Sequence, residues 1–205
     1  SYGLAGFAYG VLALSLWRRG YGNMRAELAK RAMLFGAFGS SVWGWLMLAF
    51  LLTGLGMMQV FATVADVLRY GAWFGFLLTL LRNRQDGRLD SGLGRLRPMA
   101  YLTVLVAIVA LVVATLGLVE PQRMRKVLLF SNLSLPVLGM VLLEQLFRNV
   151  ATDSRWNIKP LCLGLAGLFA FDLYLYSQAV LFNAMDPDAF STRGVVHALV
   201  VPLLL

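Results

Sequence analysis

Seven apolar runs, several of them longer than the roughly 18 residues typical of a membrane span, constrain the fold of this chain most strongly. They cover residues 2–17, 32–52, 58–81, 98–119, 127–147, 160–182 and 194–205. Backbone groups in hydrocarbon must hydrogen-bond internally, so only helices or closed barrels cross a bilayer. Barrel strands are about 10 residues long and alternate in polarity, whereas these runs are longer and apolar on all sides. The sequence therefore predicts an all-α polytopic transmembrane bundle of seven helices, forming one domain over residues 1–205.

Composition excludes the usual interpretation of a basic protein. Hydrophobic residues make up 60% and charged residues 14% of the chain, against about 25% charged in average soluble domains. The net charge of +8 would suggest nucleic acid in a soluble protein. Here the basic residues lie in short loops between apolar runs, and no basic face with interleaved aromatics is present. We expect membrane lipid and no nucleic acid as a partner.

The distribution of Lys and Arg predicts an orientation. The first, third and fifth connections between the runs hold 13 of the 18 basic residues, the second, fourth and sixth hold 4, and Arg69 lies within a run. Basic loops are cytoplasmic, so we expect a periplasmic N-terminus in the bacterial inner membrane. The seventh helix then heads into the cytoplasm and is truncated at Leu205. Arg123, Arg125 and Lys126 in the fourth connection oppose this assignment.

Ionisable side chains inside apolar runs indicate a site, because charges in a membrane are costly and face the bundle interior. Asp66 and Arg69 are three residues apart on one side of a helix, and Asp172 shares a face with Tyr176. In the predicted orientation the polar groups gather in the outer half of the bundle. We predict a ligand-binding or signal pocket there, lined by Asp66, Arg69, Tyr70, Asn132, Asp172, Tyr176, Gln178 and His197.

Structural roles stay open for these residues. For Asp66 and Arg69, a signal pocket and a buried network that fixes helix register are equally compatible with the sequence. For Asp172 the functional role is favoured. For His197 a packing or interface role is favoured. Elsewhere, Gly36, Ser40 and Gly44 form a small-residue ridge that predicts close helix packing. The five tryptophans, which include Trp43, are expected to provide interface anchors among them. Pro98 is expected in the first turn of its helix.

No motif for catalysis or cofactor binding is present. The sequence lacks a phosphate-binding loop of the GxxxxGK[ST] type, a GxSxG elbow and an HExxH helix. One cysteine, Cys162, and one histidine do not provide the Cys/His cluster that a protein-only zinc site needs. We expect no catalytic residue, cofactor or metal in this chain.

Four stretches resemble a known family: residues 144–149 (EQLFRN), 155–164 (RWNIKPLCLG), 169–177 (FAFDLYLYS) and 193–202 (RGVVHALVVP). They are similar to the PrsK-type histidine kinases of the PEP-CTERM/exosortase system. The similarity covers residues 141–205, and the earlier helices match in layout.

The resemblance implies the membrane input region of an inner-membrane two-component sensor kinase. GAF-like and histidine kinase domains, with their ATP and Mg²⁺, would follow residue 205. The protein would form a homodimer and act on a cognate response regulator that controls exopolysaccharide genes. The sequence leaves two alternatives open. One is a small transporter or channel, which needs polar groups continuing to the inner side. The other is a membrane enzyme acting on lipid or glycan, with Asp66 or Asp172 as base.

Overall fold

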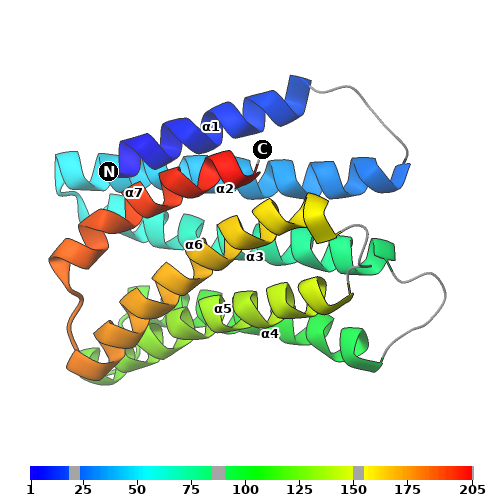
Figure 1. Ribbon diagram of the computed structural model, residues 1–205. Helices are drawn as coiled ribbons and strands as arrows, with labels where there is room; N and C mark the ends of the chain where they lie inside the picture. Colours follow the sequence, from blue (N-terminus) through cyan, green and yellow to red (C-terminus); the bar gives the residue numbers. More distant parts are fainter. Residues whose placement is uncertain (19–23, 85–90, 150–154, 205) are drawn as a thin grey trace.

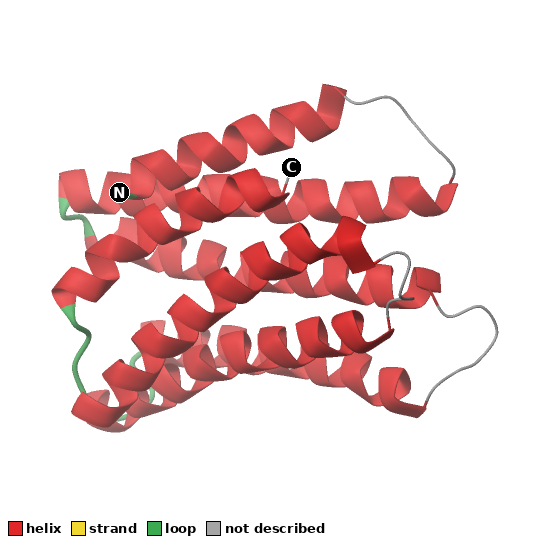
Figure 2. Cartoon of the chain, in the orientation of Figure 1, coloured by secondary structure: helices red, strands yellow, loops and turns green. Residues whose placement is uncertain are grey.

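Seven α-helices, and no strand, make up the part of the chain that the computed structural model describes, residues 1–18, 24–84, 91–149 and 155–204 (Figures 1 and 2). The helices are α1 (Tyr2–Arg18), α2 (Met24–Thr53), α3 (Gly56–Arg84), α4 (Ser91–Thr115), α5 (Pro121–Asn149), α6 (Arg155–Phe182) and α7 (Pro187–Leu204). The all-α class and the seven predicted helices are confirmed within these residues.

Five of the helices, α2 to α6, are long and apolar enough to cross a membrane. The chain is thus a multi-pass membrane protein. The other two are shorter, with 17 residues in α1 and 18 in α7. At 1.5 Å per residue they measure about 26 Å, slightly less than the roughly 30 Å hydrocarbon core.

Helix ends gather at one end of the bundle, where the α2–α3, α4–α5 and α6–α7 connections lie beside the N-terminus (Figure 2). Gly54 after α2 and Gly117 after α4 have φ angles of 66° and 65°. This left-handed conformation ends a helix and costs glycine little, since glycine has no Cβ. Asn183 ends α6 in the same way, with a φ of 52°.

Local capping places the start of α7 earlier than predicted. The Oδ1 atom of Asp186 accepts a hydrogen bond from the backbone N–H of Asp188 at 3.0 Å, and Pro187 occupies the first helical position, where its missing N–H costs nothing. The predicted start at residue 194 was therefore wrong by about two turns. Arg193, assigned to a loop by sequence, is a helical residue.

Other boundaries also moved. α4 begins at Ser91, so Pro98 lies inside the helix rather than in its first turn, and α4 ends at Thr115 rather than residue 119. α2 extends back to Met24, and Arg31 pairs with Glu27 one turn away in its polar first part. Polar first turns of this kind escape an analysis that relies on apolar runs alone.

Small residues bring α1, α2 and α7 together, as the ridge in α2 predicted. A Cβ added at Gly44 would lie 2.6 Å from the backbone nitrogen of Gly6 on α1. A Cβ at Gly194 on α7 would lie 2.6 Å from the nitrogen of Tyr2. Only residues without a side chain permit such close approach, so α1 packs closely against both α2 and α7 (Figure 1).

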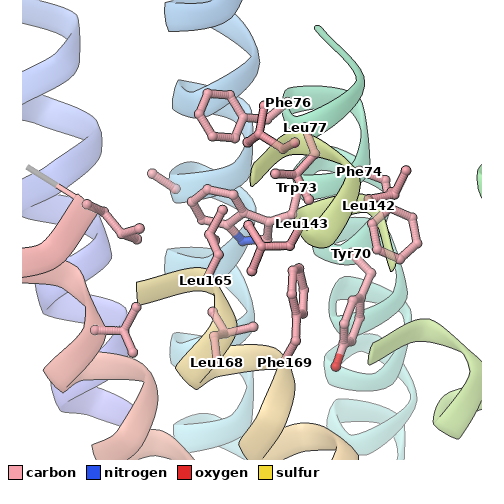
Figure 3. Packing of buried hydrophobic residues seen from close by; sticks show 14 of the residues in the cluster. Tyr70, Trp73, Phe74, Phe76, Leu77, Leu142, Leu143, Leu165, Leu168 and Phe169 are labelled. Carbon is pink, nitrogen blue, oxygen red and sulfur yellow. The ribbon is translucent and has the colours of Figure 1, made fainter. Parts of the chain in front are cut away.

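An apolar core fills the half of the bundle nearer the C-terminal ends of α1, α3 and α5. Figure 3 shows Trp73, Phe74 and Leu77 of α3 packed with Leu143 of α5 and Phe169 of α6. All five side chains are buried. This packed layer lies directly beside the polar side chains of α3, because Trp73 and Phe74 follow Tyr70 by one turn.

Candidate functional site

Four charged side chains from three helices meet inside the bundle. Asp66 and Arg69 come from α3, Asp172 from α6 and Arg193 from α7. Arg69 and Asp172 are fully buried, and Arg193 and Asp66 are 2% and 7% exposed. Two arginines and two aspartates give a formal charge of zero, as expected where isolated charges would be very costly to bury.

Arg193 joins both carboxylates. Its Nε and Nη2 atoms donate to Oδ1 and Oδ2 of Asp172 at 2.6 and 2.9 Å. Its Nη1 and Nη2 atoms donate to Oδ2 and Oδ1 of Asp66 at 2.8 and 3.3 Å. The planar guanidinium suits this two-sided bidentate arrangement, which a lysine would not reproduce. A single residue of α7 thereby connects α3 and α6.

Arg69 binds the same two carboxylates. Its Nε donates to Oδ1 of Asp66 at 2.6 Å and its Nη2 to Oδ2 of Asp172 at 3.0 Å. The Nη1 atom lies 3.1 Å from Nδ1 of His197. Arginine remains protonated in proteins, so Nδ1 must be the acceptor. His197 is therefore the neutral Nε2–H tautomer, which donates to Oδ1 of Asp172 at 3.2 Å.

Tyrosine hydroxyls complete the coordination of both aspartates. Tyr70 donates to Oδ2 of Asp172 at 2.5 Å, and Tyr176 donates to Oδ2 of Asp66 at 3.2 Å. In all, Asp172 accepts five hydrogen bonds and Asp66 accepts four. A carboxylate offers about four lone-pair sites, so both groups are fully engaged. We call Asp66, Arg69, Tyr70, Asp172, Tyr176, Arg193 and His197 the ionic network.

An aromatic side chain of α2 covers the two guanidinium groups. The Cζ atoms of Arg69 and Arg193 lie 4.2 and 4.9 Å from the ring centroid of Trp43, and the His197 ring lies 5.0 Å away. Such cation–π contacts strengthen when the cation is desolvated. Trp43 is therefore not one of the interface anchors expected among the tryptophans, since its side chain is only 1% exposed.

The structure brings together six of the eight residues predicted to line a pocket. Asp66, Arg69, Tyr70, Asp172, Tyr176 and His197 belong to the ionic network. Asn132 and Gln178 are half-buried, and neither forms a hydrogen bond with it. Sequence reasoning missed Arg193, although its position four residues before His197 and the Asp-Pro helix start gave a signal.

All seven residues of the ionic network are buried. Two hollows lie elsewhere, between α5 and α6 (Lys126, Leu129, Phe130, Val180, Leu181 and Asn183) and between α3 and α4 (Val60, Val64, Leu68, Ile108, Leu111, Val112 and Thr115). Asp66 is the charged member nearest to solvent, with 10% of its side chain exposed.

Within the described ranges, no group of three or more His, Cys, Asp or Glu side chains is placed to hold a metal ion. Cys162 is buried in α6, where it belongs to the apolar core. The chain matches no family model, no curated protein and no solved structure.

Proposed function

We propose that this chain is the membrane-embedded signal-input domain of a bacterial two-component sensor histidine kinase. The observation that carries the proposal is the attachment of Arg193, on the last helix, to Asp66 and Asp172 on two other helices. In this proposal, a change in these ion pairs shifts α7 relative to α3 and α6. A ligand shifts such an equilibrium only if it binds the two arrangements with different affinity.

The ligand in this proposal is small or lipid-like, enters from the outer half and competes for the carboxylate of Asp66, whose side chain is 10% exposed. The excess of basic residues in the first, third and fifth connections supports a periplasmic N-terminus in the inner membrane. In that orientation α7 runs toward the cytoplasm. It would relay the signal to kinase domains of a homodimer and, through them, to a response regulator.

The geometry of the ionic network favours an input role over a membrane enzyme. A general base needs a lone pair directed at substrate, and every carboxylate oxygen of Asp66 and Asp172 already accepts hydrogen bonds from arginine, tyrosine or histidine. A channel is also disfavoured, since the packed layer of Trp73, Phe74 and Phe169 lies beside the ionic network (Figure 3).

The first test is the reading frame beyond the codon for Leu205. A histidine kinase core in frame is the expected result, and a stop codon soon after Leu205 overturns the proposal. The second test uses the full-length protein in lipid nanodiscs. Autophosphorylation from radiolabelled ATP is compared for the native protein, Asp66→Asn and Asp172→Asn. Both variants are expected to change the rate several-fold.

Glu144→Gln is the matched control, because it neutralises an exposed carboxylate paired with Arg148 one turn away. It should leave the phosphorylation rate unchanged. If both aspartate variants fold with native helix content and phosphorylate at the native rate, the ionic network has only a structural role and the input proposal fails.

A further inference from the structure

The hollow between α5 and α6 is lined by both polar and apolar side chains, a combination that suits the headgroup and acyl chains of a phospholipid. Its volume is about 350 Å³, within the range of roughly 300–1,000 Å³ typical of small-molecule sites. Lys126, Leu129 and Phe130 of α5 line it together with Val180 and Leu181 of α6 and with Asn183, which follows α6. Leu129 and Phe130 follow Lys126 by three and four residues, so they lie on the same side of α5.

The basic residues at this end of the bundle are not explained by the rule that basic loops are cytoplasmic. Arg123, Arg125 and Lys126 lie in the first two turns of α5, at the opposite end from most other basic residues. Arg123 pairs with Glu120 at 3.4 Å. Arg125 and Lys126 are exposed and form no ion pair with a described residue. A positive group left unpaired beside a hollow at the membrane interface attracts an anionic headgroup.

Two of the apolar side chains that line the hollow are also exposed on the surface of the bundle. Phe130 of α5 is 59% exposed and Leu181 of α6 is 78% exposed, so both offer surface to an acyl chain. Asn183 lines the same hollow as Lys126 and carries an amide that can donate a hydrogen bond. A phosphodiester between these two donors would place its acyl chains along Phe130 and Leu181, parallel to the surrounding lipid.

We propose that this hollow binds an anionic phospholipid, with the phosphate held by Lys126 and Asn183 and the acyl chains against Leu129, Phe130 and Leu181. The site is separate from the ionic network and does not rest on the signalling proposal. It requires only that this end of the bundle lie at a membrane interface, whichever side of the membrane that is.

Native mass spectrometry of the purified chain in mixed micelles tests the proposal. Micelles containing phosphatidylglycerol are compared with micelles containing phosphatidylcholine, and the lipid retained per protein is titrated. We expect preferential retention of phosphatidylglycerol and about fivefold weaker binding to Lys126→Gln, the effect of one basic group near a membrane surface. Val180→Phe, which fills the hollow without changing charge, should also weaken binding.

Arg125→Gln is the matched control, since Arg125 is the preceding residue but does not line the hollow. It should retain phosphatidylglycerol within twofold of the native chain. Equal losses in Arg125→Gln and Lys126→Gln would mean diffuse surface attraction and overturn the site. So would unchanged binding to Lys126→Gln or equal retention of both lipids. Displacement of the lipid by millimolar inorganic phosphate would identify free phosphate as the ligand instead.

Discussion

Arg193 and Asp172 form a bidentate ion pair between α7 and α6, with nitrogen–oxygen distances of 2.6 and 2.9 Å and side chains 2% and 0% exposed. The two residues are 21 positions apart in sequence and belong to helices joined by a short connection. A buried pair of this kind offsets the desolvation of its charges only when the remaining donors and acceptors are also satisfied. Here they are satisfied, because Asp172 also accepts a hydrogen bond from Arg69 and Arg193 also donates to Asp66.

Arg193→Met should destabilise the bundle by about 3–5 kcal/mol, the usual cost of removing one partner from a buried ion pair. Asp66 and Asp172 would be left with Arg69 as the one cation of the ionic network, since His197 is neutral. Methionine keeps much of the side-chain volume, so the effect reports charge and hydrogen bonding. Unfolding by sodium dodecyl sulfate, followed by tryptophan fluorescence, measures the difference.

Arg123→Met is the control for that measurement. Arg123 is 81% exposed and pairs with Glu120 at 3.4 Å, and exposed pairs contribute little to stability. Equal unfolding curves for the two variants would show that the Arg193 pairs add no net stability.

Much of the fold could be predicted from the sequence, and the reason is physical. A bilayer demands long apolar helices, so α2 to α6 stand out as runs of apolar residues. The bilayer does not constrain the polar turns that extend such helices. This is why the start of α7 at Pro187, and with it Arg193, was missed.

The candidate site could be predicted only in part for a related reason. Asp66, Arg69 and Asp172 stand out because they interrupt apolar runs, and their spacing predicts which helix face they share. Which helix faces meet is decided by long-range packing, such as the contact between Gly44 and Gly6. The position of Trp43 over two arginines depends on that packing and not on local sequence.

Tyr70→Phe should destabilise the protein by about 1–2 kcal/mol. The variant keeps the ring, which stacks on Phe169 with centroids 6.0 Å apart, but removes the hydroxyl that donates to Asp172. Hydrogen bonds to charged groups contribute about 1.5–3 kcal/mol in soluble proteins, and those inside membranes contribute less on average. Tyr174→Phe, on the exposed side of α6 at 49% exposure, should be neutral in the same unfolding assay. A neutral Tyr70→Phe variant would contradict a stabilising hydroxyl contact.

Gly44→Ala and Gly75→Ala should have effects of opposite sign. A Cβ at Gly44 would lie 2.6 and 2.8 Å from backbone atoms of Gly6, so α1 and α2 must separate, at a cost of about 1–3 kcal/mol. A Cβ at Gly75 meets no atom within 4 Å. That variant should gain about 0.5–1 kcal/mol from the higher helix propensity of alanine. The two are compared by thermal unfolding in the same detergent, and a destabilised Gly75→Ala together with a neutral Gly44→Ala would contradict the described packing of α1 on α2.

His197 should be found as the neutral Nε2–H tautomer. Arg69 donates to Nδ1 at 3.1 Å, and a protonated Nδ1 would oppose that donor with a second one. The other ring nitrogen faces Oδ1 of Asp172 at 3.2 Å and is the donor. Nitrogen-15 NMR of protein labelled at histidine, in lipid bilayers near neutral pH, separates a protonated from an unprotonated ring nitrogen, and the single histidine makes the assignment unambiguous. We expect one of each, with only Nε2 coupled to a proton. In Arg69→Met the constraint on Nδ1 is lost while Asp172 remains, so a second proton on the ring becomes favourable. If the native protein already gives two protonated nitrogens, Arg69 does not donate to His197, and the ionic network carries one more positive charge than described.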